Sequence, residues 1–120
     1  SAFTYRELKR ELRFNTFDIL NIKTARSGYY QSHQMLVTAK QHGKGVMVGS
    51  QASSTLGTVR ATIFAGLEGI DYPSELTFFL KVAEDIMTRP IQIVDGYLDL
   101  DDLAGISLDE AQLVRFTVSP

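Results

Sequence analysis

A lysine stands at the end of a short apolar run, a position from which a side chain can do chemistry. The run Ile19–Ile22 is typical of a buried β-strand, and Lys23 follows it directly. A polar stretch then leads to Gly28. A lysine is an ordinary residue at a strand exit, but an amine at the carboxyl end of a parallel strand can also exchange protons with a substrate. Lys23 is therefore the first candidate catalytic residue.

The stretch GSQASSTLGT, Gly49 to Thr58, is rich in hydrogen-bonding groups and lies between a predicted strand and a predicted helix. Its candidate ligand-binding residues are Ser50, Gln51, Ser53 and Ser54. The free N–H groups and the positive dipole end of the helix would add to them, so a carboxylate or a phosphate could be bound there. A serine-rich helix cap is the structural alternative, and composition alone does not separate the two.

A third candidate is the glutamate in DYPSEL. Glu75 falls at or just after the end of a third predicted strand. A carboxylate at this position would lie at the same end of the sheet as Lys23 and Gln51, because the carboxyl ends of parallel strands meet there. A surface glutamate is the structural alternative.

Several familiar motifs are excluded. Gly43 and Gly45 give G-x-G, but Val48 stands where a dinucleotide loop needs its third glycine, and these glycines precede the strand that they should follow. The histidines, His33 and His42, are nine residues apart on one predicted helix, which is not a metal-ligand spacing.

The composition is that of a globular protein. The chain has 120 residues, of which 44% are hydrophobic and 22% charged, with a net charge of −2. This charge does not favour nucleic acid or an anionic membrane as a partner. The sequence has no cysteine, no signal-peptide pattern and no apolar run near the ~20 residues that span a bilayer. We therefore expect a location in the reducing cytoplasm.

Hydrophobic periodicity and turn residues divide the first part of the chain into alternating helices and strands. The predicted elements are a helix ending near Phe14 that begins with the capping box of Thr4 and Glu7, a strand Ile19–Ile22, a loop Lys23–Tyr29, a helix Gln31–His42, a strand Gly45–Val48, a helix Thr55–Ala65 and a strand Ile70–Tyr72.

The spacing of these elements indicates parallel βαβ units. Strand starts near Ile19, Gly45 and Gly69 give a repeat of roughly 25 residues. This repeat suits a (β/α)8 barrel, which needs about 250 residues in total. With 120 residues the chain is either a small open α/β sheet or a piece of a barrel.

The tail follows another pattern. Ile91–Leu100 alternates around Asp95-Gly96, which predicts a β-hairpin with a type I′ turn. Leu108–Phe116 predicts a short helix at most. No linker is present, so we expect one partial domain over residues 1–120, with barrel units over about 1–88 and the hairpin and tail over 89–120.

The order of these motifs resembles the last third of one enzyme group. Asn21-Ile22-Lys23 with Arg26 and Gly28 is similar to the N-I-K-x-x-R-x-G-G motif at the end of a sixth barrel strand. The segments His42–Thr58, Gly69–Ile86, Asp95-Gly96 and Gly105–Glu110 are similar to the seventh strand and its loop, the segment after the eighth strand and the C-terminal segment. The chain thus resembles the mandelate racemase and muconate lactonizing enzyme group of the enolase superfamily.

The resemblance implies an α/β fold made of strands six to eight of a (β/α)8 barrel with their helices, followed by the C-terminal hairpin. It implies a muconate cycloisomerase-like or racemase-like isomerase that moves a proton beside the carboxylate of a small substrate, with Mg²⁺ or Mn²⁺ as cofactor. Lys23 matches the sixth-strand lysine, which acts as base, acid or electrostatic stabiliser in different subgroups. Ser50, Gln51, Ser53, Ser54 and Glu75 would line the substrate pocket.

The resemblance also implies what this chain does not supply. The family's metal ligands lie on the third, fourth and fifth strands, and its other lysine on the second; the chain would start just after the fifth. We therefore expect the isolated chain to be inactive and to form a homo-oligomer or to associate with the missing barrel portion. Two alternatives remain open: a non-catalytic, self-associating α/β module, and a part of a phosphate-binding barrel enzyme.

Overall fold

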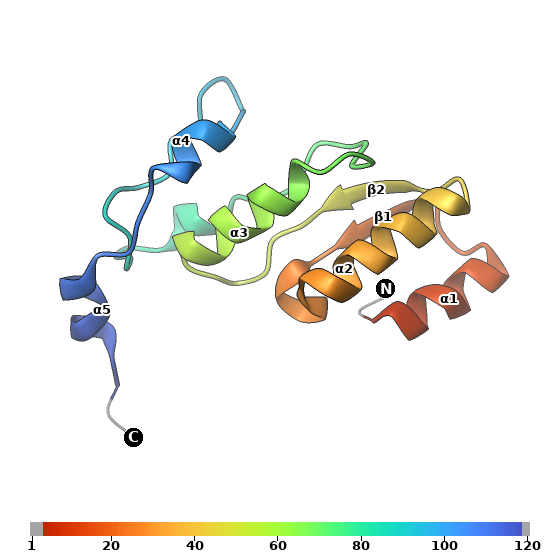
Figure 1. Cartoon of the computed structure of the whole chain (residues 1–120), viewed down its shortest axis with the longest axis horizontal. Coiled ribbons are helices and arrows are strands. Elements are labelled where there is room, and N and C mark those ends of the chain that lie inside the picture. The colour runs from red at the N-terminus through yellow and green to blue at the C-terminus, as the bar shows by residue number, and fades with distance from the viewer. Residues whose placement is uncertain (1–3, 119–120) are drawn as a thin grey trace.

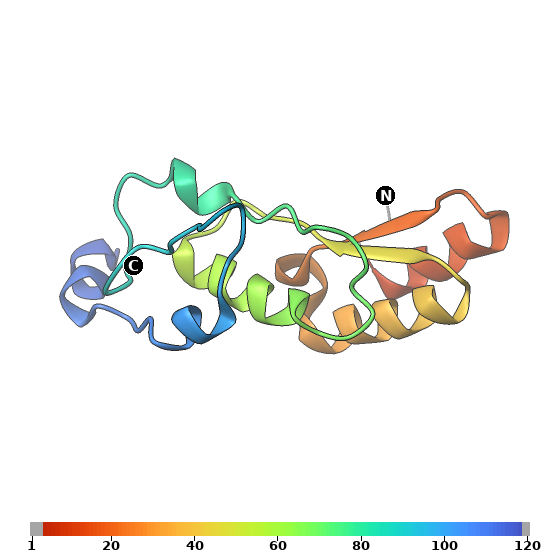
Figure 2. The ribbon, with the colours of Figure 1, turned by 90° about the horizontal axis from the view of Figure 1, so that it is seen from above.

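In the computed structural model, which describes residues 4–118, two parallel strands lie beside helices on one side (Figures 1 and 2). The elements in chain order are α1 (Tyr5–Phe14), β1 (Ile19–Ile22), α2 (Thr24–Gln41), β2 (Gly45–Val48), α3 (Thr55–Ala65), the 3-10 helix η1 (Phe78–Lys81), α4 (Leu100–Ala104) and α5 (Glu110–Phe116). The alternation of strands and helices confirms the predicted α/β class.

The strands β1 and β2 pair in parallel, from Ile19 opposite Gly45 to Ile22 opposite Val48. Every second side chain along each strand is buried, as the alternation of apolar residues predicts. These buried side chains form the main hydrophobic core with apolar side chains of the three long helices. The core residues are Leu8, Leu20, Ile22, Met35, Leu36, Ala39, Val46, Val48, Ala61, Phe64 and Leu76.

The other face of the two strands is open. Ile19 and Asn21 on β1 are exposed and Met47 on β2 is half-buried. Figure 2 shows α1, α2 and α3 gathered on the opposite side of the strands. A parallel sheet normally has both faces covered, so this open face is unusual for an α/β protein.

The first helix begins as its sequence predicts. Thr4 Oγ1 accepts a hydrogen bond from the Glu7 amide at 3.2 Å, and the Glu7 carboxylate accepts one from the Thr4 amide at 3.1 Å. This reciprocal pair satisfies amides that the first helical turn leaves without partners. Leu8 is fully buried and fixes α1 against the main core.

The predicted loop Lys23–Tyr29 is wrong, because helical structure starts directly after Lys23. The Arg26 amide donates to the Lys23 carbonyl at 2.9 Å, which closes the first turn of α2. Gly28 then interrupts the helix with φ 68° and ψ 166°. Only glycine adopts this backbone conformation readily, and its presence made a polar helical turn look like a loop.

The third strand predicted at Ile70–Tyr72 is also wrong as a regular strand. The segment runs along β2, and the amides of Asp71 and Glu75 donate to β2 carbonyl oxygens at 3.0 and 2.9 Å. Glu75 also forms an isolated parallel bridge with Gly49. Pro73 lies between these contacts and has no N–H to donate, so a continuous ladder cannot form.

In the tail, the predicted turn is formed but the strands of the hairpin are not. Asp95 and Gly96 have φ values of 51° and 83°, the two positive values that a type I′ turn requires. Only Val94 and Tyr97 pair across the turn among the described residues. The tail is held instead by a second hydrophobic cluster, made of Val59, Phe79, Ile91 and Leu103.

The molecule is flat, with extents of 49 × 40 × 21 Å and a radius of gyration of 15.9 Å. A compact chain of this length is expected to have a radius of gyration of about 14 Å. Over residues 4–118, no helix is long and apolar enough to cross a membrane.

Candidate functional site

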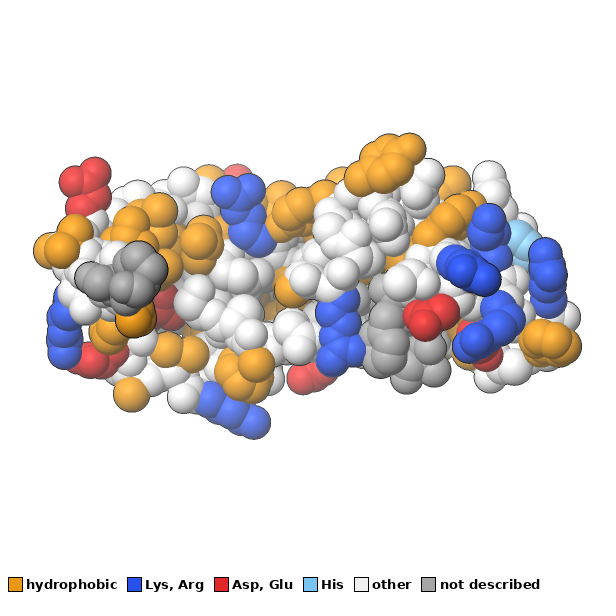
Figure 3. All heavy atoms as spheres, turned by 90° about the horizontal axis from the view of Figure 1, so that it is seen from below, with side chains coloured by type: hydrophobic (Ala, Val, Ile, Leu, Met, Phe, Trp, Pro, Cys, Tyr) orange, Lys and Arg blue, Asp and Glu red, His pale blue; other side chains and the backbone are white. Residues whose placement is uncertain are grey.

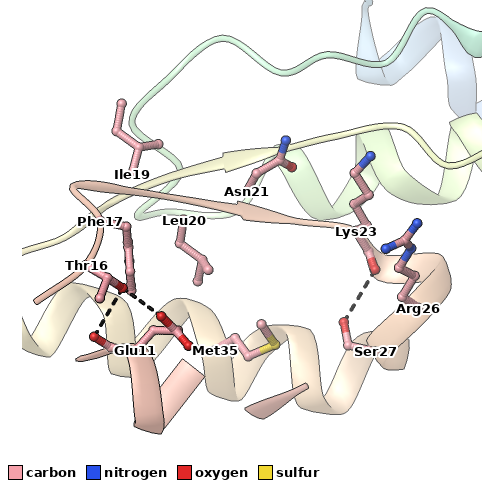
Figure 4. Close-up of a pocket in the computed structure, with 10 residues that line it drawn as sticks. All are labelled: Glu11, Thr16, Phe17, Ile19, Leu20, Asn21, Lys23, Arg26, Ser27 and Met35. Atoms are coloured by element: carbon pink, nitrogen blue, oxygen red, sulfur yellow. Dashed lines mark hydrogen bonds between the residues drawn. The ribbon is translucent and has the colours of Figure 1, made fainter. Parts of the chain in front are cut away.

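Lys23 lies where β1 passes into α2, with its side chain on the open side of the strand. Figure 4 shows its ammonium group on the same side as the side chains of Ile19 and Asn21. The residue is half-buried, and its ammonium group makes no hydrogen bond or ion pair with any residue of the described part of the chain. The Lys23 carbonyl, in contrast, accepts the Arg26 amide. The backbone is therefore fixed while the amine stays available to a ligand.

A cavity begins beside Lys23 and follows β1. Its volume is about 740 Å³, comparable with the 300–1,000 Å³ of small-molecule sites. It is lined by Glu11, Thr16, Phe17, Ile19, Leu20, Asn21, Lys23, Arg26, Ser27 and Met35. We call it the β1 groove.

Arg26 joins the two strand ends. Its Nε donates to Oε1 of Gln51 at 2.6 Å, across 25 positions of sequence. This contact brings the loop after β2 to the first turn of α2, which also carries Lys23. Lys23, Arg26 and Gln51 therefore lie together at the carboxyl ends of the two strands, as the parallel arrangement predicts.

Ser50 and Glu75 meet through the backbone of Glu75. Ser50 donates to the Glu75 carbonyl oxygen twice, from its amide at 2.6 Å and from its hydroxyl at 2.7 Å. The Glu75 residue is exposed, and its carboxylate has no hydrogen-bond partner within residues 4–118. The Ser50 hydroxyl thus fixes the segment beside β2, while the Glu75 carboxylate is free to face a ligand.

The start of α3 already holds a carboxylate from this chain. Oδ2 of Asp85 accepts the Thr55 amide at 2.7 Å, whereas Ser54, the N-cap residue, makes no side-chain capping bond. Asp85 therefore occupies the helix start at which the sequence predicted a bound carboxylate or phosphate. Sequence reasoning missed this residue because it lies 30 positions after the helix start.

Ser50, Gln51 and Ser53 line a second, very small cleft of about 10 Å³. This volume is about that of one water probe, so the cleft does not take a small organic acid. A Cβ on Gly57 would lie 2.6 Å from the Ser53 Cβ, so the loop packs tightly on α3. Ser50, Gln51 and Ser53 thus line a small cleft in this structure, and their role in binding a substrate stays a prediction.

Asn21 is a site residue that sequence reasoning did not single out. Its amide lies directly against Gly49, where any added Cβ would overlap it. Asn21 alternates with the buried residues of β1 and therefore points to the open face beside Lys23 (Figure 4). The alternation of exposed and buried residues along β1 was the sequence signal that could have identified Asn21.

The described residues do not form a metal centre. Over residues 4–118, no three His, Asp or Glu side chains are grouped so that they could bind one metal ion. Divalent cations such as Mg²⁺ need several oxygen ligands in a fixed arrangement. A Mg²⁺ site therefore does not fit the donor groups of this part of the chain alone.

Comparison with known proteins identifies the origin of this arrangement. Residues 1–112 match the family described as enolase C-terminal domain-like. Over 109 residues the sequence is 30% identical to muconate cycloisomerase 1-1 of Acinetobacter lwoffii, covering 88% of this chain and 29% of that protein.

Solved structures give the same relationship. The muconate lactonizing enzyme of Pseudomonas putida superposes with a TM-score of 0.82 and 25% identity, over 93% of this chain and 32% of that one. The N-succinyl Arg/Lys racemase of Bacillus cereus superposes with a TM-score of 0.85 and 25% identity, over 98% and 32%.

The chain therefore spans about 29% of the length of its curated relative. The same fold, the match over residues 1–112 and the curated relatives agree on one family. The chain belongs to the enolase C-terminal domain-like family, within the mandelate racemase and muconate lactonizing enzyme group of the enolase superfamily.

Proposed function

We propose that this chain supplies strands six to eight of the barrel of a metal-dependent, muconate cycloisomerase-like or racemase-like enzyme. In this assembly Lys23 transfers a proton at the carbon next to the carboxylate of a small substrate. The observation that carries the proposal is the Lys23 ammonium group, which is half-buried, has no partner within residues 4–118 and lies beside the β1 groove.

The proton transfer can be written with Lys23 in either direction. As a neutral amine, Nζ takes the proton of the substrate C–H bond, and the electron pair moves toward the carboxylate. As an ammonium group, Nζ returns a proton to the same carbon. General acid–base catalysis of this kind contributes about 10²–10⁴-fold to a rate.

The neighbours of Lys23 position it and the substrate. Arg26 and Gln51 hold the two strand ends together, and Asn21 presents an amide on the same face. The exposed Glu75 carboxylate stands at the end of the adjacent segment. We propose Ser50, Ser53 and Ser54 as supports of this loop more than as direct ligands. The Ser50 hydroxyl donates to the Glu75 carbonyl and the Ser54 carbonyl accepts from Thr58. Ser53 packs so close to Gly57 that an added Cβ there would overlap it.

The proposed metal ion would be Mg²⁺ or Mn²⁺. Bound beside the substrate carboxylate, such an ion would supply positive charge for the intermediate. Its ligands would come from polypeptide outside these 120 residues. The isolated chain would then neither hold the metal tightly nor turn over a substrate, and its partners would be the remaining barrel portion or further copies of itself.

Proton exchange in heavy water tests this proposal. The complementing fragment is the P. putida muconate lactonizing enzyme without the segment that this chain matches. The chain, the fragment, and both together are incubated with Mg²⁺ in D₂O with N-succinyl-L-lysine, L-Ala-L-Glu or muconolactone, and the substrate proton is followed by NMR. We expect exchange only in the mixture.

Lys23→Ala should reduce the exchange rate by about 100-fold or more. The matched control is Lys9→Ala, which removes a lysine that lies over the Tyr5 ring on α1 and should leave exchange unchanged. Exchange that survives Lys23→Ala would refute the role of Lys23. Exchange by the chain alone would refute its dependence on other polypeptide.

A further inference from the structure

We propose that the outer face of α1 docks on the acidic C-terminal part of a second copy of this chain, in a head-to-tail contact that salt weakens. The basic residues of this face do not line the β1 groove, so the inference does not depend on the proton transfer proposed for Lys23. It rests on three observations: an unpartnered basic helix face, acidic residues in a distant part of the chain, and a fold that keeps the two apart.

Helix α1 exposes four basic side chains on one face. They recur at intervals of three and four residues, so they lie along one side of the helix over about 10 Å. We call them the α1 basic face: Arg6, Lys9, Arg10 and Arg13, all exposed. Arg10 is paired with Glu11 at 2.7 Å, whereas Arg6 and Arg13 make no hydrogen bond or ion pair within residues 4–118. Two guanidinium groups are therefore available to a partner.

Negative charge is concentrated in the C-terminal part of the chain. Residues 81–120 carry eight Asp or Glu and three Lys or Arg, a net charge of −5, whereas residues 1–80 carry six and nine, a net charge of +3. Asp95, Asp99 and Asp101, in the turn before α4 and its first residues, are exposed and form no ion pair within residues 4–118. We call these three residues the α4 acidic surface.

The two surfaces do not meet within one molecule. Figure 1 shows α1 and α4 far apart, with α2 and α3 between them. Among the helices and strands of residues 4–118, α1 contacts α2, and α4 contacts α3. Charges this far apart are screened from each other at 0.1 M salt, where the Debye length is about 10 Å. The two surfaces can therefore meet only when two molecules associate.

A second copy supplies the complementary charge with little overall repulsion. The whole chain has a net charge of only −2, so its opposite ends attract those of another copy more than the molecules repel as wholes. Each surface also carries an exposed ring: Phe14 next to Arg13 is 73% exposed, and Tyr97 beside the α4 acidic surface is 78% exposed. Arginine stacks on aromatic rings, which adds to ion pairs that are weak individually. The expected contact is weak and sensitive to ionic strength.

The contact is heterologous, because two different surfaces meet. Each added copy leaves one α1 basic face and one α4 acidic surface free at the ends of the assembly. Unless the rotation closes a ring, such a contact gives open chains of copies without a fixed size. A two-fold contact would instead join the same surface of both copies.

Sedimentation velocity of the 120-residue chain tests the inference. At about 0.01 M salt the mean sedimentation coefficient should rise with protein concentration. At about 1 M salt it should return to the value of the monomer, because the Debye length falls from about 30 Å to about 3 Å.

Two variants identify the surfaces. Arg6→Glu with Arg13→Glu makes the α1 basic face acidic. Asp95→Asn with Asp101→Lys removes the charge of the acidic surface, and the Asn-Gly pair that it creates keeps the preferred residues of the turn. Each variant alone should associate about tenfold more weakly or worse, because attraction is replaced by repulsion. An equal mixture of the two should associate within about threefold of the unchanged chain, because each variant retains the surface that the other has lost.

The matched control is Arg60→Glu with Lys81→Glu. It changes the net charge by the same amount as the α1 variant, at two exposed residues outside both surfaces. Its association should stay within about threefold of that of the unchanged chain.

Four results would overturn the inference. They are a chain that stays monomeric at low salt, association that persists at about 1 M salt, equal losses in the control and the α1 variant, and a mixture of the two variants that does not associate. Association that resists salt would assign the contact to an apolar surface, such as the open face of β1 and β2. Failure of the mixture would show that the α1 basic face does not pair with the α4 acidic surface.

Discussion

At the scale of single residues, the site depends on which polar groups are already occupied. Arg26 and Gln51 are bonded to each other, the Ser50 hydroxyl is bonded to the Glu75 carbonyl, and the Thr55 amide is bonded to Asp85. The Lys23 ammonium group has no such partner in the described part of the chain. This contrast separates the polar residues that support the structure from Lys23, which we assign to proton transfer, and from the exposed Glu75 carboxylate.

Asp85 should matter more to α3 than its own N-cap residue does. Asp85→Ala removes the acceptor of the Thr55 amide and should lower the free energy of unfolding by about 0.5–2 kcal/mol, the usual cost of a lost helix cap. Ser54→Ala is the matched control and should be nearly neutral, because the Ser54 side chain makes no capping bond. Urea denaturation measures both, and equal losses would contradict the assignment.

Asp71 should contribute stability that depends on pH. Its hydrogen bonds with the Lys40 ammonium and the Val46 amide lower the pKa of the Asp71 carboxyl below its usual value of about 3.9. The stabilisation is therefore present above about pH 4 and is lost as pH falls through the lower pKa of the folded state.

Asp71→Asn keeps an acceptor for the Val46 amide and removes the charge. It should destabilise the chain at pH 7, and the difference from the unchanged chain should shrink as pH falls below about 4, where the native carboxyl becomes protonated too. Thermal unfolding from pH 7 to pH 2.5 measures this difference. A difference that stays constant over this range would contradict the role of the charge.

At the scale of secondary-structure elements, local sequence patterns correctly predicted the strands and the turn, whose form depends on residues close together in the sequence. The alternation in Ile19–Ile22 and Gly45–Val48 predicted both strands, and the Asp95-Gly96 pair predicted its turn. The helical turn between Lys23 and Gly28 was missed, because a break at a glycine resembles a loop. The irregular third segment was read as a strand although Pro73 limits its pairing.

The candidate site shows the same difference between what local sequence predicts and what only the folded structure reveals. Lys23 could be predicted as a candidate because it directly follows a strand. The contact between Arg26 and Gln51 and the cap that Asp85 places on Thr55 join residues 25 and 30 positions apart. No local sequence pattern records such contacts, because they exist only once the elements have packed.

The close approach of the two strands near their carboxyl ends can be tested by a double-mutant cycle. Gly49→Ala places a methyl group against the Asn21 amide and should cost about 1–3 kcal/mol, as other overpacked sites do. In an Asn21→Ala background the same change should cost much less, because the overlapping amide is gone. Chemical denaturation of the four proteins measures the coupling, and additive losses would contradict the contact.

At the scale of the whole molecule, the chain has two hydrophobic clusters that share α3. Ala61 and Phe64 belong to the main core, and Val59 belongs to the second cluster with Ile91. Figure 3 shows many hydrophobic side chains exposed on the half of one face that holds the tail, and basic side chains gathered at the opposite end. Helix α5 contributes no buried residue to either cluster.

The two clusters should respond differently to loss of a core side chain. Ile22→Ala and Ile91→Ala each remove a buried isoleucine and should each cost about 2–5 kcal/mol locally. Hydrogen exchange measured by mass spectrometry should speed up in β1, β2 and α2 for Ile22→Ala, but mainly in residues 82–118 for Ile91→Ala. Equal acceleration of both regions by Ile91→Ala would show one cooperative unit.

The cap of α3 by Asp85 also bears on how this sequence can change under selection. At a helix start the N-cap residue is usually the position least free to change, and in α3 that residue is Ser54. Here the constraint is transferred to Asp85, 30 positions further along the chain. We expect accepted substitutions to accumulate at Ser54 while Asp85 varies little, and a lineage that loses Asp85 to regain a functional cap at position 54.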